Sequence, residues 1–132
     1  MYNNTGLIKS FAPTAATAPF SAVKFGADDN TIALATAATD LVIGFTNEIE
    51  ITADDVTKGS LVDVVLTDIA EARAGAVITR GSRLTVDSTG RVIVAAPATG
   101  ANAQIIGVAM KSASSADEII PVLISRSVMQ GA

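Results

Sequence analysis

The chain has 132 residues, a formal net charge of −4, and neither cysteine nor histidine. Without those side chains there is no disulfide, no thiolate metal site and no histidine general base, and we expect no cofactor. The acidic balance disfavours nucleic acid and anionic membranes as partners, because both are negatively charged themselves. The sequence shows no secretory signal pattern and no apolar run of roughly 18 residues, so we expect a soluble protein made in a cytoplasm.

Residues 1–21 differ in composition from the rest of the chain. Pro13 and Pro19 disfavour helix at the residues before them, and no hydrophobic period is visible. We therefore predict an extended N-terminal arm over residues 1–21 and a β domain over residues 22–132. A plain frayed terminus is the alternative. The arm carries apolar side chains that a solvated tail does not need and that we expect to dock on a partner, namely Tyr2, Leu7, Ile8, Phe11 and Phe20.

From residue 23 onward the pattern is that of β-strands. The only helix expected is a short one that begins after Thr52, with Asp55 completing a weak capping box, and that stops at Gly59. A D-S-T-G-R turn between two apolar flanks predicts a β-hairpin over residues 83–96. Alternating and β-branched segments predict further strands within residues 30–40, 41–45, 47–51, 60–69, 70–78, 104–112 and 118–128.

Two parts of the chain share one succession of β features. Residues 32–34 align with 92–94, Gly44 aligns with Gly107, and a strand ending at Leu66 aligns with one ending at Ile124. We predict a mainly β fold, a small β-barrel or sandwich built from a duplicated β unit. Within it we expect the two glycines to let their strands turn a corner. The alternative is that short β segments align loosely by chance.

Side chains able to carry out chemistry are scarce. A Ser–His–Asp triad needs a histidine, and the acidic pairs at residues 28–29 and 54–55 lack the spacing of a calcium loop. We expect solvated turn residues there, and we expect that the protein is not an enzyme. Three basic side chains, Arg80, Arg83 and Arg91, surround the predicted hairpin. Cross-strand ion pairs account for them, and the alternative is a patch that faces an acidic partner surface.

A succession of strand and turn residues runs through the second half of the chain. Its members are Val62, Val64, Leu66, Asp68, Ile69, Ala70, Ala74, Gly75, Gly81, Leu84, Asp87, Gly90, Arg91, Ile106, Gly107 and Ala109. This succession resembles the patterns V-x-V-x-L-x-G-I-A-x-V-x-A-G, G-x-x-L-x-x-D-x-x-G-R and I-G-x-A of the capsid decoration, or cement, proteins of tailed bacteriophages. The resemblance covers roughly residues 23–126. Asp68 stands where family members often have glycine.

The resemblance implies a structural protein of the virion. Such a protein is made in the host cytoplasm, binds the outer surface of the phage head and cements neighbouring major capsid proteins, which stabilises the capsid. The resemblance also implies a homo-oligomer on the capsid, with a trimer favoured over a dimer. A ligand- or carbohydrate-binding β module on a virion or cell surface is the alternative function.

Overall fold

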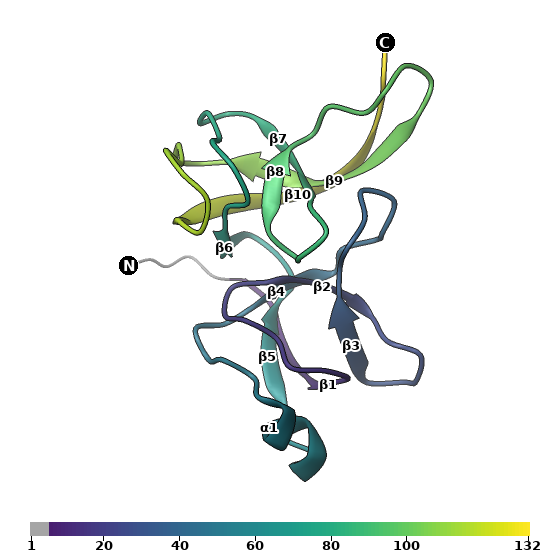
Figure 1. Ribbon diagram of the computed structural model, residues 1–132, viewed down its shortest axis with the longest axis vertical. Helices are drawn as coiled ribbons and strands as arrows, with labels where there is room; N and C mark the ends of the chain where they lie inside the picture. The colour runs from purple at the N-terminus through teal and green to yellow at the C-terminus, as the bar shows by residue number, and fades with distance from the viewer. Residues whose placement is uncertain (1–5) are drawn as a thin grey trace.

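The computed structural model describes residues 6–132, which form two β-sheets and one short helix (Figure 1). The first sheet is a closed barrel with the strand order β1-β3-β2-β4-β5, and the second has five strands in the order β6-β10-β9-β7-β8. We call them the barrel unit and the sheet unit. The barrel unit contains β1 (Ile8–Pro13), β2 (Ala22–Phe25), β3 (Thr31–Leu34), β4 (Gly44–Thr46), α1 (Ala53–Lys58) and β5 (Val62–Val65). The sheet unit contains β6 (Ile69–Arg73), β7 (Arg83–Val86), β8 (Val92–Val94), β9 (Asn102–Ala109) and β10 (Ile119–Gln130).

The barrel closes because β1 pairs on both of its edges. It runs antiparallel to β5, with Ile8 opposite Val65, and parallel to β3, with Ala12 opposite Thr31. Closure removes the exposed strand edges that otherwise invite aggregation. The barrel interior is apolar and consists of Phe11, Val23, Ile32, Ile43, Ile51, Val62 and Val64.

The sheet unit repeats the strand pairings of the barrel unit. In the barrel unit β2 pairs with β3 and β4, β4 with β5, and β5 with β1, while in the sheet unit β7 pairs with β8 and β9, β9 with β10, and β10 with β6. The closing parallel contact recurs as a single bridge between Ala74 and Val92. The registers and turn hydrogen bonds make these positions equivalent, barrel unit first: Ala22 and Arg83, Phe25 and Val86, Asn30 and Gly90, Leu34 and Val94, Ala35 and Ala95, Val42 and Ile105, Ile43 and Ile106, Phe45 and Val108.

Gly44 and Gly107 lie at equivalent positions where two strands approach closely. A Cβ at Gly44 would collide with the backbone carbonyl of Val65, and one at Gly107 would collide with that of Leu123. No side chain fits between strands at such a distance. These glycines therefore permit a close backbone approach, where the sequence predicted a corner.

One hydrophobic core joins the two units. From the barrel unit, Ala22, Ala35, Val42 and Phe45 lie in the same buried cluster as the interior of the sheet unit. Phe45 is completely buried there, which for a side chain of this size contributes about 1.5–3 kcal/mol. The sheet-unit members of this cluster include Leu84, Val86, Val92, Ile106, Ile120 and Val122.

The arm predicted for residues 1–21 is not a separate segment in the described part of the chain. From Ile8 to Pro13 the backbone is β1, and Phe11 is buried inside the barrel. Further on, Phe20 donates its N–H to the carbonyl of Asn47. An extended segment that lies between the edges of β3 and β5 gains backbone hydrogen bonds on both sides, and this outweighs the freedom of a solvated arm. The boundary expected at residue 22 therefore falls inside the barrel.

The helix and the hairpin form where the sequence predicted them. The Thr52 hydroxyl accepts a hydrogen bond from the N–H of Asp55 (3.1 Å), the Asp55 carboxylate accepts one from the N–H of Thr52 (2.9 Å), and Gly59 ends α1 with φ of 77°. Strands β7 and β8 form the hairpin. The strand expected over residues 47–51 is absent from the described fold, where the segment makes a single bridge between Ile51 and Thr17. The Asn47 side chain accepts the N–H of Ile49, which turns the backbone at the start of the segment.

Candidate functional site

The barrel unit has an apolar groove at one open end, with a volume of about 650 Å³. We call it the barrel groove. Two aromatic side chains pack against each other there: Phe11 meets Phe25 edge to face, with the ring centroids 6.5 Å apart. Lys9 Nζ lies 5.2 Å from the ring centroid of Phe11. Phe25 is 62% exposed, which is unusual for so large an apolar side chain. The groove is lined by Lys9, Phe11, Phe25, Ile43, Leu66 and the β2–β3 turn, residues 26–30.

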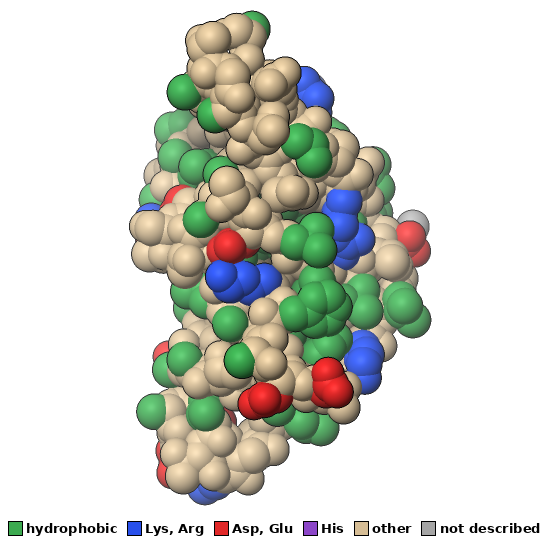
Figure 2. All heavy atoms as spheres, turned by 90° about the vertical axis from the view of Figure 1, so that its right-hand side faces the viewer, with side chains coloured by type: hydrophobic (Ala, Val, Ile, Leu, Met, Phe, Trp, Pro, Cys, Tyr) green, Lys and Arg blue, Asp and Glu red, His purple; other side chains and the backbone are tan. Residues whose placement is uncertain are grey.

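The β2–β3 turn at the rim of the barrel groove is acidic, whereas Lys9 lies on the lining as well. Asp28 and Asp29 are both exposed in the β2–β3 turn. The Thr31 hydroxyl holds this turn by donating to the Asp28 carbonyl (2.6 Å), and Asn30 completes it with φ of 62°. Seen from the side on which this turn lies in Figure 1, hydrophobic side chains gather in the middle of the molecule, with acidic side chains below them and basic side chains beside them (Figure 2). An apolar partner that carries positive charge complements such a surface.

The equivalent end of the sheet unit is covered. Val86, which corresponds to Phe25, is only 3% exposed. The cover is the outer side of the barrel unit, where the N–H of Ala22 donates to the carbonyl of Gly90 (2.9 Å) and the Leu34 side chain leaves no room for a Cβ at Gly90. Among the described residues, one end is thus covered and the other is open.

Arg126 fixes one wall of the barrel groove from the sheet unit. It lies in β10 at the point where the pairing with β9 shifts register. Its guanidinium donates to the carbonyl oxygens of Val42 (3.0 Å), Ile43 and Leu66 (3.0 Å). Since Ile43 and Leu66 line the barrel groove, this arginine couples the shape of the groove to the packing of the two units.

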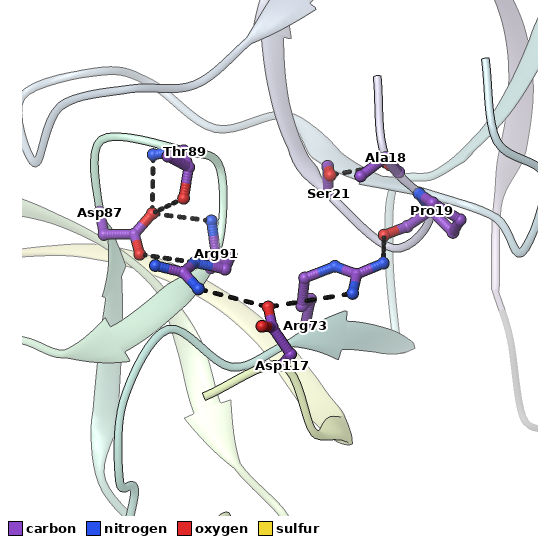
Figure 3. Close-up of polar contacts among 8 residues, drawn as sticks. All are labelled: Ala18, Pro19, Ser21, Arg73, Asp87, Thr89, Arg91 and Asp117. Carbon is purple, nitrogen blue, oxygen red and sulfur yellow. Dashed lines mark hydrogen bonds and ion pairs between the residues drawn. The ribbon is translucent and has the colours of Figure 1, made fainter. Parts of the chain in front are cut away.

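A polar cluster closes the seam between the units (Figure 3). Asp117 lies 3.2 Å from Nη1 of Arg91 and 3.9 Å from Nη1 of Arg73. Arg73 also donates to the carbonyl of Pro19 (3.1 Å), and Arg91 donates through Nε to Asp87 (3.0 Å). The charged groups pair across the seam, although Nε of Arg73 is buried without a hydrogen-bond partner, and the cluster offers no reactive pair among the described residues.

Asp87 is held ionised in this cluster. Burial by itself raises the pKa of Asp87, but hydrogen bonds from the N–H groups of Thr89 (2.8 Å) and Arg91 (3.0 Å), together with the Arg91 charge, outweigh burial and leave the pKa below its ordinary value. The pKa of Asp40 is also lowered, first by the N–H of Thr36 and then by Lys24. Carboxylates with lowered pKa values are poor proton donors near neutral pH.

Within residues 6–132, no three or more acidic side chains are grouped so that they could hold a metal ion. Over those residues no helix combines the length and the apolar character needed to cross a membrane.

The side chains predicted to dock through an arm lie in different environments. Tyr2 lies outside the described residues. Leu7 and Ile8 are 62% and 48% exposed at the beginning of β1. Phe11 is buried in the barrel beneath the barrel groove, and Phe20 is half-buried with φ of 57°. Docking through these side chains stays a prediction.

The three arginines near the hairpin do not form one patch. Arg91 lies at the turn, paired with Asp87 and Asp117, whereas Arg83 begins β7 at the opposite end of the hairpin. Both Arg83 and Arg80, which lies in the preceding loop, are exposed. A role opposite an acidic partner stays a prediction for these two arginines.

Sequence reasoning missed the barrel groove and Arg126. A usable signal for the groove was Phe25, a large apolar residue directly before the polar turn at residues 26–30. For Arg126 no comparable signal exists, since its partners are backbone carbonyls of residues distant in the chain.

The backbone conformation of Asp68 accounts for its place at a position where decoration proteins often have glycine. Its φ is 66°, in the left-handed region that glycine adopts freely and aspartate tolerates. Its carbonyl accepts the N–H of Ile124 (2.8 Å), so this backbone conformation is tied to the β10 strand.

Comparison with known proteins identifies the family. A family model described as phage cement protein matches residues 3–124. The fold is similar to that of the head fiber gp8.5 N base of bacteriophage phi29, with a TM-score of 0.66 and 16% sequence identity over 94% of this chain and 98% of that chain. A search of curated proteins gave no match. The resemblance noted in the sequence is thereby confirmed, and the chain belongs to the phage cement proteins, a family of structural, non-enzymatic proteins of the phage capsid.

Proposed function

We propose that this protein binds the outer surface of an assembled phage head and cements neighbouring major capsid proteins. The match to the phage cement family over residues 3–124 carries this proposal. A closed barrel sharing one core with a second sheet is a rigid body, which suits a clamp under load. Several weak contacts to neighbouring subunits then sum to tight attachment.

We propose Leu7 and Ile8 as capsid-contacting side chains. Their exposure of 62% and 48% supports this role, because apolar side chains of this size contribute about 1.5–3 kcal/mol each when fully buried. Replacing both with serine should weaken head binding at least tenfold and leave the fold intact. Val77→Ser, at a side chain that is 67% exposed in the sheet unit, is the matched control.

The proposal is tested by mixing the purified protein with heads that lack it and sedimenting them. Saturable co-sedimentation, together with retention of packaged DNA at temperatures where undecorated heads release it, is the expected result. Binding without any gain in head stability would contradict the cementing role.

We also propose that copies form a homo-oligomer on the head, with a trimer favoured over a dimer. The resemblance to decoration proteins supports this proposal. Mass measurement of the free protein and image reconstruction of decorated heads test it. Single densities with no contact between copies would contradict it.

We further propose that the two units descend from one duplicated β unit. The recurrence of the strand pairings supports this, as do Gly44 and Gly107, which face equivalent carbonyls of Val65 and Leu123. The difference lies in closure, since only the barrel unit pairs its first and third strands over more than one bridge. Substituting the two glycines in turn should therefore give similar losses of stability.

A further inference from the structure

Each of the two surfaces that meet between the units has a counterpart elsewhere in the molecule that no described residue covers. Within the chain, the covered end of the sheet unit rests on the outer side of the barrel unit, at Ala22, Leu34 and Phe45. The free counterpart of the covered end is the barrel groove. The free counterpart of the outer side of the barrel unit is the outer side of the sheet unit.

The outer side of the sheet unit is accessible and carries one positive charge, that of Arg83. Arg83 is exposed at the position of Ala22, Val94 is 40% exposed at the position of Leu34, and Val108 is half-buried at the position of Phe45. Ala95 and Ile105, which are equivalent to Ala35 and Val42 of the shared core, are already buried within the chain. The free surface therefore consists of Arg83, Val94 and Val108.

We infer that the barrel groove of one copy binds the outer side of the sheet unit of a second copy, which repeats between copies the contact that joins the units within one chain. Within the chain, Ala22 lies beside Gly90. Their equivalents are Arg83 and Asn30, so the repeated contact brings Arg83 of one copy beside the acidic turn of the next.

Charge and apolar area agree with this pairing. The turn that holds Asn30 also carries the exposed carboxylates of Asp28 and Asp29, which are opposite in sign to Arg83. Phe25 beside them is 62% exposed and gains burial against Val94. Rim charges of this kind set orientation and partner choice more than affinity.

The inferred contact is head-to-tail, since the two surfaces differ. Such contacts close into a ring when the rotation between copies permits, and otherwise continue as a chain. The contact rests on the equivalence of the two units, and it supplies the interface for the homo-oligomer proposed above. The competing occupant of the barrel groove is the capsid protein itself.

A pair of engineered cysteines tests the inferred contact. The chain contains no cysteine, so Asn30→Cys together with Arg83→Cys introduces the only thiols, both at exposed positions. A disulfide needs Cα atoms about 4.4–6.8 Å apart, so a contact that holds the two positions together favours joining of the thiols of different copies over chance encounters. The matched control is Asn30→Cys with Lys58→Cys, which moves the second thiol to α1, away from the inferred surface.

Oxidation is carried out on concentrated free protein and on decorated heads. We expect oligomers linked by disulfides with the Asn30→Cys/Arg83→Cys variant and at least tenfold fewer with the control. Equal cross-linking of the two variants, or none in either setting, would overturn the inference. A thiol-reactive cross-linker joining position 30 to the capsid protein in place of position 83 would overturn it as well, and would assign the barrel groove to the capsid.

Charge reversal gives an independent measurement by sedimentation equilibrium. Arg83→Glu should weaken self-association at least tenfold, and adding Asp28→Lys and Asp29→Lys on the same chain should restore it. Lys58→Glu makes the same change in net charge and should have no effect. If the triple variant did not regain self-association while its circular dichroism was unchanged, the inferred contact would be contradicted. If the wild-type protein did not bind heads at all, that result would count only against the proposed function.

Discussion

Replacing Arg126 with alanine should destabilise the protein more than any other change at an exposed position. The substitution removes the hydrogen bonds to the carbonyls of Val42, Ile43 and Leu66. A hydrogen bond to a charged group contributes about 1.5–3 kcal/mol, but one guanidinium makes all of these bonds and water can reach part of the site. We therefore expect a loss of about 2–3 kcal/mol in the free energy of unfolding. For a chain of this size that corresponds to a fall in Tm of roughly 6–12 °C.

Thermal and denaturant melts of three variants measure this effect. Arg126→Lys keeps the charge, but an ammonium group cannot span the separate carbonyls, so it should recover less than half of the loss. Lys111→Ala, at an exposed turn position, should change stability by no more than about 0.5 kcal/mol. If Arg126→Ala had the same Tm as Lys111→Ala, the view that the Arg126 side chain holds the two units together would be refuted.

Three further predictions concern the glycines, pH and metal ions. Gly107→Ala should lower the free energy of unfolding several times more than Gly81→Ala, because a Cβ at Gly107 collides with the Leu123 carbonyl. At Gly81 a Cβ meets no atom, and only the positive φ of 93° disfavours alanine. Equal losses in denaturant melts would contradict the close strand approach. The pKa of Asp87 is lower in the folded than in the unfolded chain, so its stabilisation is complete above the ordinary value near 3.8 and is lost as the pH falls through the folded pKa, and Asp87→Asn should flatten that acid loss. A chelator should leave Tm unchanged, and a fall of several degrees would reveal a metal site that the chain's composition argues against.

Local features of the fold were predictable because their causes lie within a few residues. The capping box of Thr52 and Asp55 and the stop at Gly59 placed α1 within one residue of its observed bounds. The hairpin of β7 and β8 was equally clear, since its turn and its apolar flanks are adjacent in the chain.

The placement of β1 depended on contacts that local patterns do not contain. Pro13 and the lack of a period suggested an arm, but Phe11 is buried because β5 and β3, both far along the chain, offer edges to pair with. An extended segment looks the same in the sequence whether it lies in solvent or completes a barrel.

The sequence predicted only the polar turn at the rim of the barrel groove, and not the groove itself. The turn at Asp28 and Asp29 was visible as a polar turn, and its carboxylates are indeed exposed. That Phe25 stays exposed while the equivalent Val86 is buried depends on how the two units pack, which no short-range pattern encodes.

The central claim, that this protein is a clamp on the outside of a phage head, is tested most directly by image reconstruction of heads before and after addition of the purified chain. The account predicts added density on the outer surface that spans adjacent major capsid proteins, with copies touching through the barrel groove and the outer side of the sheet unit. Density confined to the interior of the head, or no added density at saturating protein, would contradict it.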